Sequence, residues 1–204
     1  MKLEKIAYSF FGNNLIIGSH IKKQLTFLKE IVPAELQQRE MDDLGCGDGQ
    51  VTVLLEKIFQ PRKLRGFDIN RGLVRRARNR GIDAKIIDLN RQVPVGELAV
   101  MWGVLHHLHD FESCLCRVKE SYPLIFIREP VRTSFMAGVE LGYPLRLKDI
   151  LCLVNRYLPG SQIHYCDNSI LLFYLCPEYN KQEEAFAVPV HSSMCPDLIT
   201  AGRY

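Results

Sequence analysis

The sequence predicts an α/β protein with a doubly wound, mostly parallel β-sheet and helices on both of its faces. Apolar stretches of strand length alternate along the chain with longer segments in which apolar residues recur at helical spacing. A glycine-rich turn at residues 43–49 joins the first predicted strand to a helix. The ends of the first three strands carry acidic residues, namely Asp43, Asp68 and Asp88. Because ligands of such sheets bind outside the carboxyl ends of the strands, this pattern predicts a binding site at that edge.

Length and composition fit one soluble globular domain. The chain has 204 residues, of which 47% are hydrophobic and 24% are charged. A net charge of +3 is too small to indicate nucleic acid or an anionic membrane as a partner. The seven cysteines are scattered, without the spacing of a disulfide framework or a zinc ribbon. Because we find no apolar signal segment and no apolar run of membrane-spanning length, we expect a cytoplasmic protein with reduced thiols.

Residues 1–39 are predicted to form a helical lid ahead of the first strand. Residues 20–32 have amphipathic helical spacing, and Pro33 is expected to end that helix. The pairs Asn13-Asn14 and Gly18-Ser19 are expected to break or cap helices in this segment. The segment either covers a bound ligand or only caps the core, and the sequence supports both interpretations.

The turn at 43–49 has the spacing Asp-x-Gly-x-Gly-x-Gly. Glycines there allow positive φ angles and let a ligand lie against bare backbone, while N–H groups of the following helix, residues 51–59, face that ligand. The dinucleotide-binding fingerprint needs a third glycine, or an alanine, at position 50. The chain has Gln50 there, which argues against a nicotinamide-dependent oxidoreductase.

The second and third strands are predicted at residues 63–70 and 84–90. Asp68 follows the glycine turn by about twenty residues, the interval at which an acid reaches a ribose diol in a βαβ unit. A helix N-cap is the alternative role for Asp68. Between the strands we expect a helix closed by Gly81. That helix carries a cluster of arginines, read as a solvated face rather than an RNA-binding surface: Arg71, Arg75, Arg76, Arg78 and Arg80.

A fourth strand is predicted at residues 98–102, apolar throughout as expected of a strand covered on both faces. Three histidines and an acid follow it: His106, His107, His109 and Asp110. Such residues could bind a metal, but no cysteine or further acid stands at a recognisable ligand spacing, so we expect no metal site.

The remaining elements are predicted from caps, breaks and alternation. A helix at 111–122 begins with Asp110 as its N-cap, and a fifth strand follows at 123–127. Glu129 and Arg132 come at the carboxyl end of that strand and either line an acceptor pocket or form a salt-bridged loop. After a poorly patterned connection, we expect a helix at 145–158, an antiparallel hairpin of residues 162–166 and 170–176, and a tail.

From Asp43 to about Cys176 the chain resembles the class I S-adenosylmethionine-dependent methyltransferases of the small-molecule type. The glycine turn, Asp68, the pair Asp88-Leu89 and the segment Val-Leu-His-His at 104–107 occur in the family's order. Glu97 departs from the family, which usually has Asp there. The resemblance implies a Rossmann-like sheet of seven strands with an antiparallel C-terminal hairpin. It also implies three parts, which are a lid at 1–39, the methyltransferase domain at 40–176 and a tail at 177–204.

The resemblance further implies transfer of a methyl group from S-adenosylmethionine to a small-molecule acceptor by in-line displacement. His106 and Glu129 are the candidates for taking a proton from the acceptor. In the family, the residues matching Asp88 and Leu89 bind the adenine through a carboxylate and a backbone N–H. The expected cofactor-binding residues are Asp43, Gly45, Cys46, Gly47, Gly49, Asp68, Ile69, Asp88, Leu89 and Trp102.

Two other functions stay open. A non-catalytic scaffold could keep the same fold, and a related enzyme could methylate RNA or protein. The sequence has no Asn-Pro-Pro-Tyr or Asp-Pro-Pro-Tyr segment after the fourth strand and no appended RNA-binding domain, which favours a small-molecule acceptor. A homodimer is among the assemblies that the sequence permits.

Overall fold

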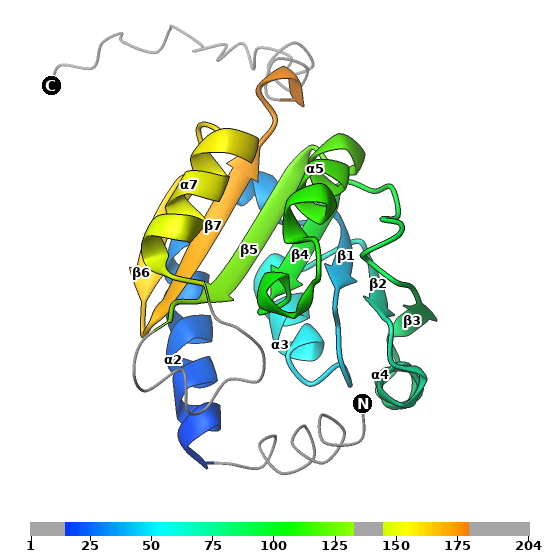
Figure 1. The fold of residues 1–204 in the computed structure, drawn as a ribbon. Coiled ribbons are helices and arrows are strands. Elements are labelled where there is room, and N and C mark those ends of the chain that lie inside the picture. Colours follow the sequence, from blue (N-terminus) through cyan, green and yellow to red (C-terminus); the bar gives the residue numbers. More distant parts are fainter. Residues whose placement is uncertain (1–14, 133–144, 180–204) are drawn as a thin grey trace, which may run out of the picture.

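The computed structural model describes residues 15–132 and 145–179, and within them seven strands form one sheet (Figure 1). The strand order is β3-β2-β1-β4-β5-β7-β6. Strands β1 to β5 run parallel, and β7 is antiparallel to both β5 and β6. The strand bounds are Glu40–Leu44 for β1, Lys63–Asp68 for β2, Asp83–Ile86 for β3, Leu98–Trp102 for β4, Leu124–Pro130 for β5, Gln162–Cys166 for β6 and Ser169–Leu175 for β7. This architecture confirms the predicted fold.

Helices cover both faces of the sheet, with α5 and α7 in front of it and α2 behind it in Figure 1. Their bounds are Leu15–Ile31 for α2, Thr52–Phe59 for α3, Arg71–Asn79 for α4, Phe111–Ser121 for α5 and Leu147–Tyr157 for α7, with short 3₁₀ turns η1 at Ala34–Leu36 and η2 at Leu105–His107. None of the helices within these described ranges has the length and apolar character needed to cross a bilayer.

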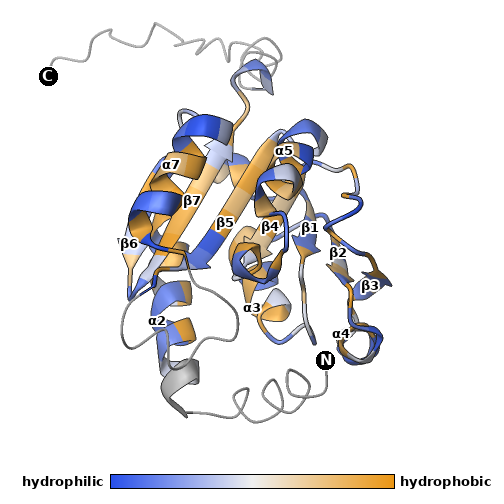
Figure 2. Cartoon of the chain, in the orientation of Figure 1, coloured by the Kyte–Doolittle hydropathy of each residue, from blue (hydrophilic) through white to orange (hydrophobic). Residues whose placement is uncertain are grey.

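The two faces of β4 show how the core is divided. Leu98 and Val100 pack in a cluster with residues of α2 and α3, whereas Ala99 and Met101 pack in a second cluster with residues of α5 and α7. Successive side chains of a strand point to opposite faces, so a strand covered on both sides is apolar at every position. Figure 2 shows the same division, with largely apolar strands and helices that are apolar on one side only.

Helix α2 and the turn η1 form a layer of this core. Leu28 and Leu36 are fully buried in the cluster with α3. Gly18 and Ser19 lie inside α2, so the prediction that they break or cap the helix is wrong. An isolated glycine within a helix costs only about 1 kcal/mol relative to alanine, and packing of the rest of the helix outweighs that cost.

Two strand ends differ from the prediction by three residues or more. The third strand ends at Ile86, and Asp88 lies beyond it in a turn. The backbone carbonyl of Asp88 accepts hydrogen bonds from the N–H groups of Arg91 and Gln92. The fifth strand extends to Pro130 because it pairs with β7 along its whole length, with Glu129 opposite Ile170. Glu129 is therefore a fully buried strand residue, and its interpretation as part of a salt-bridged loop is wrong.

Several predicted segments fall wholly or partly outside the described residues. These are the first part of the lid at 1–14, including Asn13-Asn14, most of the connection after the fifth strand at 133–144, and most of the tail at 180–204. The beginning of the predicted tail, residues 177–179, is described and packs on the domain. There Arg39 donates a hydrogen bond to the Tyr179 hydroxyl at 3.0 Å and lies over its ring.

Candidate active site

The glycine turn follows β1 and presents three glycines with positive φ angles, +89° at Gly45, +57° at Gly47 and +83° at Gly49. A Cβ atom added to Gly45 would lie 2.5 Å from a methyl group of Val104, and one added to Gly49 would lie 2.5 Å from the Ile82 Cδ1 atom. A Cβ atom added to Gly47 would meet nothing within 4 Å. The outer glycines are thus needed for packing, while Gly47 turns bare backbone toward open space.

Asp68, at the end of β2, holds this turn in place. One carboxylate oxygen accepts a hydrogen bond from the Gly47 N–H at 3.0 Å, and the other accepts one from the Asn70 N–H at 2.7 Å. Burial raises the pKa of Asp68, and these two bonds oppose that effect. The N-cap of α4 is Asn70, whose side chain accepts from the Gly72 and Leu73 N–H groups, so the alternative role of Asp68 as N-cap is wrong.

Ile69 and Cys46, two predicted cofactor-binding residues, differ in exposure. Ile69 follows Asp68 and leaves 62% of its surface exposed, which is unusual for a large apolar side chain at a polar strand end. Cys46 is buried, and its sulfur would lie 2.9 Å from a Cβ atom at Gly66. Burial raises the pKa of the Cys46 thiol. The structure therefore gives Ile69 the exposure that contact with a ligand requires, whereas the Cys46 side chain packs inward.

Asp43 lies beneath the glycine turn. Its carboxylate is 2% exposed and accepts a hydrogen bond from the Thr52 hydroxyl at 2.5 Å, which ties the end of β1 to the start of α3. The pKa of Asp43 is raised to about 7, mainly by burial and further by the charge of Asp68, while the bond from Thr52 opposes this shift. This geometry supports a role in shaping the turn rather than in touching a ligand.

Asp88 and Leu89 form the turn after β3. The Asp88 carboxylate accepts hydrogen bonds from the side chain and the N–H of Asn90, and these bonds lower the pKa of Asp88. The Leu89 side chain is buried, and its carbonyl accepts a hydrogen bond from Arg117 of α5 at 3.0 Å. Arg117 anchors this turn, although its position inside a predicted helix gave no sign of that role.

His106 and Glu129, the two candidates for proton transfer, meet at the carboxyl ends of β4 and β5. The Glu129 carboxylate is paired with His106 Nδ1 and also accepts hydrogen bonds from the N–H groups of His106, at 3.1 Å, and Leu105, at 3.2 Å. The Glu129 side chain is 0% exposed and that of His106 is 1% exposed. Glu129 therefore fixes the turn η2 and the orientation of the imidazole ring.

Arg128 and Gln24 are residues of this edge that the sequence did not reveal. The Arg128 Nε–H donates to the Gln24 side-chain oxygen at 2.8 Å, and the guanidinium carbon lies 5.4 Å from the centroid of the Trp102 ring. Gln24 in turn donates to the Asp167 carbonyl at 3.1 Å and the Ser169 hydroxyl at 3.0 Å. Helix α2 is thereby joined to the ends of β5 and β7. Partners more than 100 residues apart leave no periodic signature that sequence reasoning could use.

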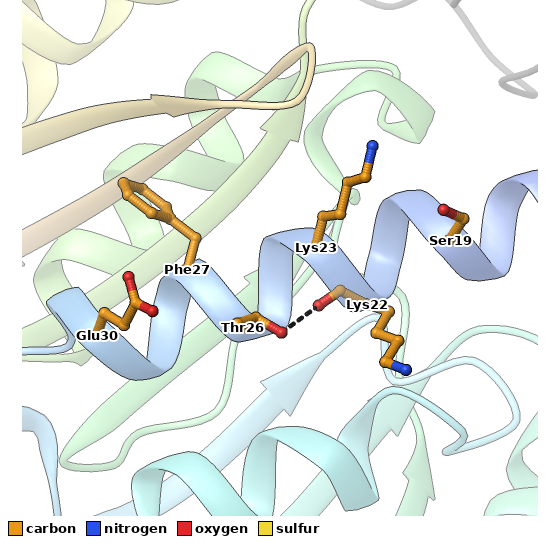
Figure 3. Close-up of a pocket in the computed structure, with 6 residues that line it drawn as sticks. All are labelled: Ser19, Lys22, Lys23, Thr26, Phe27 and Glu30. Atoms are coloured by element: carbon orange, nitrogen blue, oxygen red, sulfur yellow. Dashed lines mark hydrogen bonds between the residues drawn. The ribbon is translucent and has the colours of Figure 1, made fainter.

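Other features contribute little to this edge. Arg132, predicted to border an acceptor, is exposed. Within the described residues, no three His, Cys, Asp or Glu side chains gather as metal ligands would. A surface depression follows α2 instead, and Figure 3 shows the side chains that line it, among them Lys22, Phe27 and Glu30. It contains none of the site residues described above, and its only marked hydrogen bond joins the Thr26 hydroxyl to the Lys22 carbonyl.

Comparisons with known sequences find methyltransferases. A family profile described as "Methyltransferase domain" matches residues 43–121, from the glycine turn to the end of α5. A curated trans-aconitate 2-methyltransferase of Afipia carboxidovorans is 38% identical over 55 residues, which is 27% of this chain and 22% of that protein. The match therefore spans about a fifth of that relative.

Solved structures share the fold over most of the chain. The magnesium protoporphyrin IX methyltransferase of Synechocystis PCC 6803, with bound S-adenosylhomocysteine, has a TM-score of 0.58 at 15% identity, covering 80% of this chain and 88% of that one. The plantazolicin methyltransferase, also in complex with S-adenosylhomocysteine, has a TM-score of 0.67 at 13% identity, covering 84% of this chain and 90% of that one. The chain therefore shares the fold of these methyltransferases, and its residues 43–121 match the methyltransferase-domain profile.

Proposed function

We propose that this protein binds S-adenosylmethionine and transfers its methyl group to a small-molecule acceptor. The observation that carries the proposal is the open backbone of Gly47, fixed by Asp68, at the same sheet edge as the His106–Glu129 pair. A ligand can approach the Cα of Gly47 because this residue has no side chain and faces open space, whereas Gly45 and Gly49 are tightly packed. The open side of this turn is the feature that a nucleotide-like cofactor requires.

The residues at this edge fit S-adenosylmethionine. The backbone around Gly47 would hold the methionine part. Asp68 would bind the ribose, because each carboxylate oxygen can accept a hydrogen bond beyond the one it takes from the backbone. The exposed side chain of Ile69 would cover the adenine, whose burial against an apolar surface is favourable. Asp88 and the Leu89 N–H would bind the edge of the adenine.

The residues near the acceptor would orient it and manage its proton. When bound, S-adenosylmethionine supplies a methyl group on a positively charged sulfur, which is already reactive toward nucleophiles. The protein's task is then alignment and exclusion of water. His106 would accept a proton from the acceptor where one must be lost, and Glu129 would hold the ring for that role through its bond to Nδ1.

The acceptor belongs to the small-molecule class in this proposal. The similar structures reported above are named for magnesium protoporphyrin IX and plantazolicin, and the curated relative is named for trans-aconitate. trans-Aconitate is therefore the first acceptor to assay. S-adenosylhomocysteine formation should depend on the acceptor and fall when His106 is replaced by glutamine.

The direct test is calorimetric titration of the protein with S-adenosylmethionine, S-adenosylhomocysteine and NADH. We expect both sulfur nucleotides to bind and NADH not to bind. Asp68→Ala should weaken binding by about 10- to 100-fold, because a charged acceptor of hydrogen bonds is lost. Failure of wild-type protein to bind either sulfur nucleotide would refute the proposal, whereas NADH binding would point to an oxidoreductase.

A further inference from the structure

We propose that Asn90 is a positioning residue that couples binding of the cofactor's adenine to the turn η2, which carries His106. This inference rests on the proposed cofactor site and adds to it a connection between the cofactor side and the acceptor side of the sheet edge. It is carried by the hydrogen bonds that the Asn90 side chain makes to Asp88 and to the N–H group of His109.

The Asn90 side chain joins two turns that the sheet itself keeps apart. Strands β2 and β1 lie between β3 and β4, so no strand pairing links the turn after β3 to the turn after β4. The Asn90 Nδ2 donates to Asp88 Oδ1 at 3.1 Å, and the Asn90 Oδ1 accepts from the His109 N–H at 3.1 Å. Only this orientation of the amide serves both partners, because a backbone N–H can only donate and an ionised carboxylate can only accept. A single planar group thus connects Asp88 to His109.

On the cofactor side, Asn90 fixes the carboxylate that is expected to bind adenine. Asp88 Oδ1 accepts hydrogen bonds from the side chain and the backbone N–H of Asn90, and these bonds hold the pKa of Asp88 below its ordinary value. Asp88 Oδ2 lies 3.4 Å from Nε of the largely exposed Arg91, and 28% of the Asp88 side chain is itself exposed. The carboxylate can therefore accept a bond from the adenine amino group while Asn90 holds its other oxygen.

On the acceptor side, the turn η2 is held at both of its ends. Glu129 accepts hydrogen bonds from the first two N–H groups of η2, and Asn90 accepts one from His109 just after the turn. A 3₁₀ turn has poorer hydrogen-bond geometry than an α-helix, so it depends on such anchors. Restraint of Asn90 by a bound ligand should therefore restrain η2, and with it the His106 ring.

The Asn90 side chain can be removed without releasing the turn to which it belongs. The Arg117 guanidinium of α5 donates to the backbone carbonyls of Leu89 at 3.0 Å and of Asn90 at 3.1 Å. The backbone N–H of Asn90 also donates to Asp88 at 3.0 Å. Because these bonds need no side chain at position 90, a variant there should keep the adenine turn in place and still bind the cofactor.

The test is hydrogen exchange at single amides of the full chain, with and without saturating S-adenosylhomocysteine. The His107 and Leu108 amides report opening of η2, because they donate to the Val104 and Leu105 carbonyls. In wild-type protein the ligand should slow their exchange by at least about fivefold, the lower end of the usual coupling between sites. In Asn90→Ala, measured at its own saturating concentration, the slowing should fall below about twofold.

Two further variants separate coupling from a merely structural role. Asn90→Asp keeps an oxygen for the His109 N–H but cannot donate to Asp88. It should therefore show wild-type exchange in η2 without ligand, yet lose the slowing that the ligand causes. This variant also carries the test if Asn90→Ala does not fold. Asn155→Ala removes the same side chain from the exposed face of α7 and should change neither quantity.

The proposal fails if S-adenosylhomocysteine binds wild-type protein without slowing exchange at His107 and Leu108. It also fails if the Asn90 variants show the slowing of wild type, since the ligand would then reach η2 by another route. Failure of the proposed function is recognised separately, because wild-type protein would then not bind S-adenosylhomocysteine at all.

Discussion

Gly45 and Gly47 share a positive φ but differ in what lies beside them. Alanine at Gly45 would bring a methyl group within 2.5 Å of one Val104 methyl and 3.1 Å of the other, so no simple rotation of Val104 relieves the contact. Alanine at Gly47 meets no atom within 4 Å and bears only the backbone cost of a positive φ, about 1 kcal/mol. Substitution of Gly45 therefore tests folding, whereas substitution of Gly47 tests ligand binding.

We expect Gly45→Ala to lower the free energy of unfolding by about 3 kcal/mol, because overpacking adds to backbone strain. Gly47→Ala should lower it by about 1 kcal/mol, yet weaken S-adenosylhomocysteine binding by at least about tenfold, because its methyl group enters the open side of the turn. Urea unfolding and calorimetric titration of both variants measure these effects. Unchanged affinity in a folded Gly47→Ala protein would mean that no ligand lies against this backbone.

Asp43 gives the protein a pH dependence of known sign. Its pKa is raised from 3.8 to about 7, so the folded state binds more protons than the unfolded state between these values. Its contribution to stability is complete below about pH 4 and is lost as the pH rises through about 7. The raised pKa of Asp68 acts in the same direction.

Replacing Asp43 by Asn should remove this dependence. Relative to the variant, wild-type protein should lose stability between pH 4 and pH 8, by at most about 4 kcal/mol. The measurement is urea unfolding of both proteins across that range, with the difference in unfolding free energy plotted against pH. A difference that stays constant, or that grows in favour of wild type as the pH rises, would contradict the assigned direction.

At the scale of elements, a buried polar network joins β1, β2 and the end of α5. Asp42 accepts two hydrogen bonds from the Arg65 guanidinium, both 2.6 Å long, and one from the Tyr122 hydroxyl at 2.6 Å. Burial raises the pKa of Tyr122, and its bond to Asp42 adds to that effect. Asp42 is 1% exposed. Its removal would take the carboxylate away from the Arg65 guanidinium and the hydrogen-bond acceptor away from the Tyr122 hydroxyl.

Asp42→Ala should therefore lower the free energy of unfolding by about 3 kcal/mol, and Tyr122→Phe by only about 1 kcal/mol. Asp83→Ala is the matched control, because this aspartate of β3 is exposed and should contribute almost nothing. Chemical denaturation of the three variants gives the values. Equal losses for Asp42→Ala and Asp83→Ala would show that the network does not stabilise the fold.

The strands could be predicted from the sequence, whereas the buried polar contacts between elements could not. Alternating and continuous apolar residues predicted the strands, because a strand covered on both faces must be apolar at nearly every position. Glu129 was predicted to follow the fifth strand, either lining an acceptor pocket or in a salt-bridged loop. Its place inside the strand was missed because its partners, the N–H groups of η2, have no sequence signal. The hydrogen bond from Arg128 to Gln24 was missed for a related reason. The two residues belong to separate elements, and only the tertiary fold brings them together and buries them.

For the whole molecule, the sheet order brings residues from distant parts of the sequence to one edge. Gly47, Asp68, Asp88 and His106 lie at or just after the carboxyl ends of four parallel strands, and each was predicted from its spacing relative to a strand end. They come together because parallel strands deliver their carboxyl ends to the same side, and their roles in binding stay predictions.

The most direct test of the proposed cofactor site is a map of S-adenosylhomocysteine binding by nuclear magnetic resonance of the ¹⁵N-labelled protein. We expect the largest amide shifts at Gly47, Ile69 and Leu89, with small shifts along the outer face of α2 near Lys22. This pattern would establish the sheet edge as the cofactor site. Shifts centred on α2, or no shifts at saturating ligand concentration, would contradict the assignment of that edge.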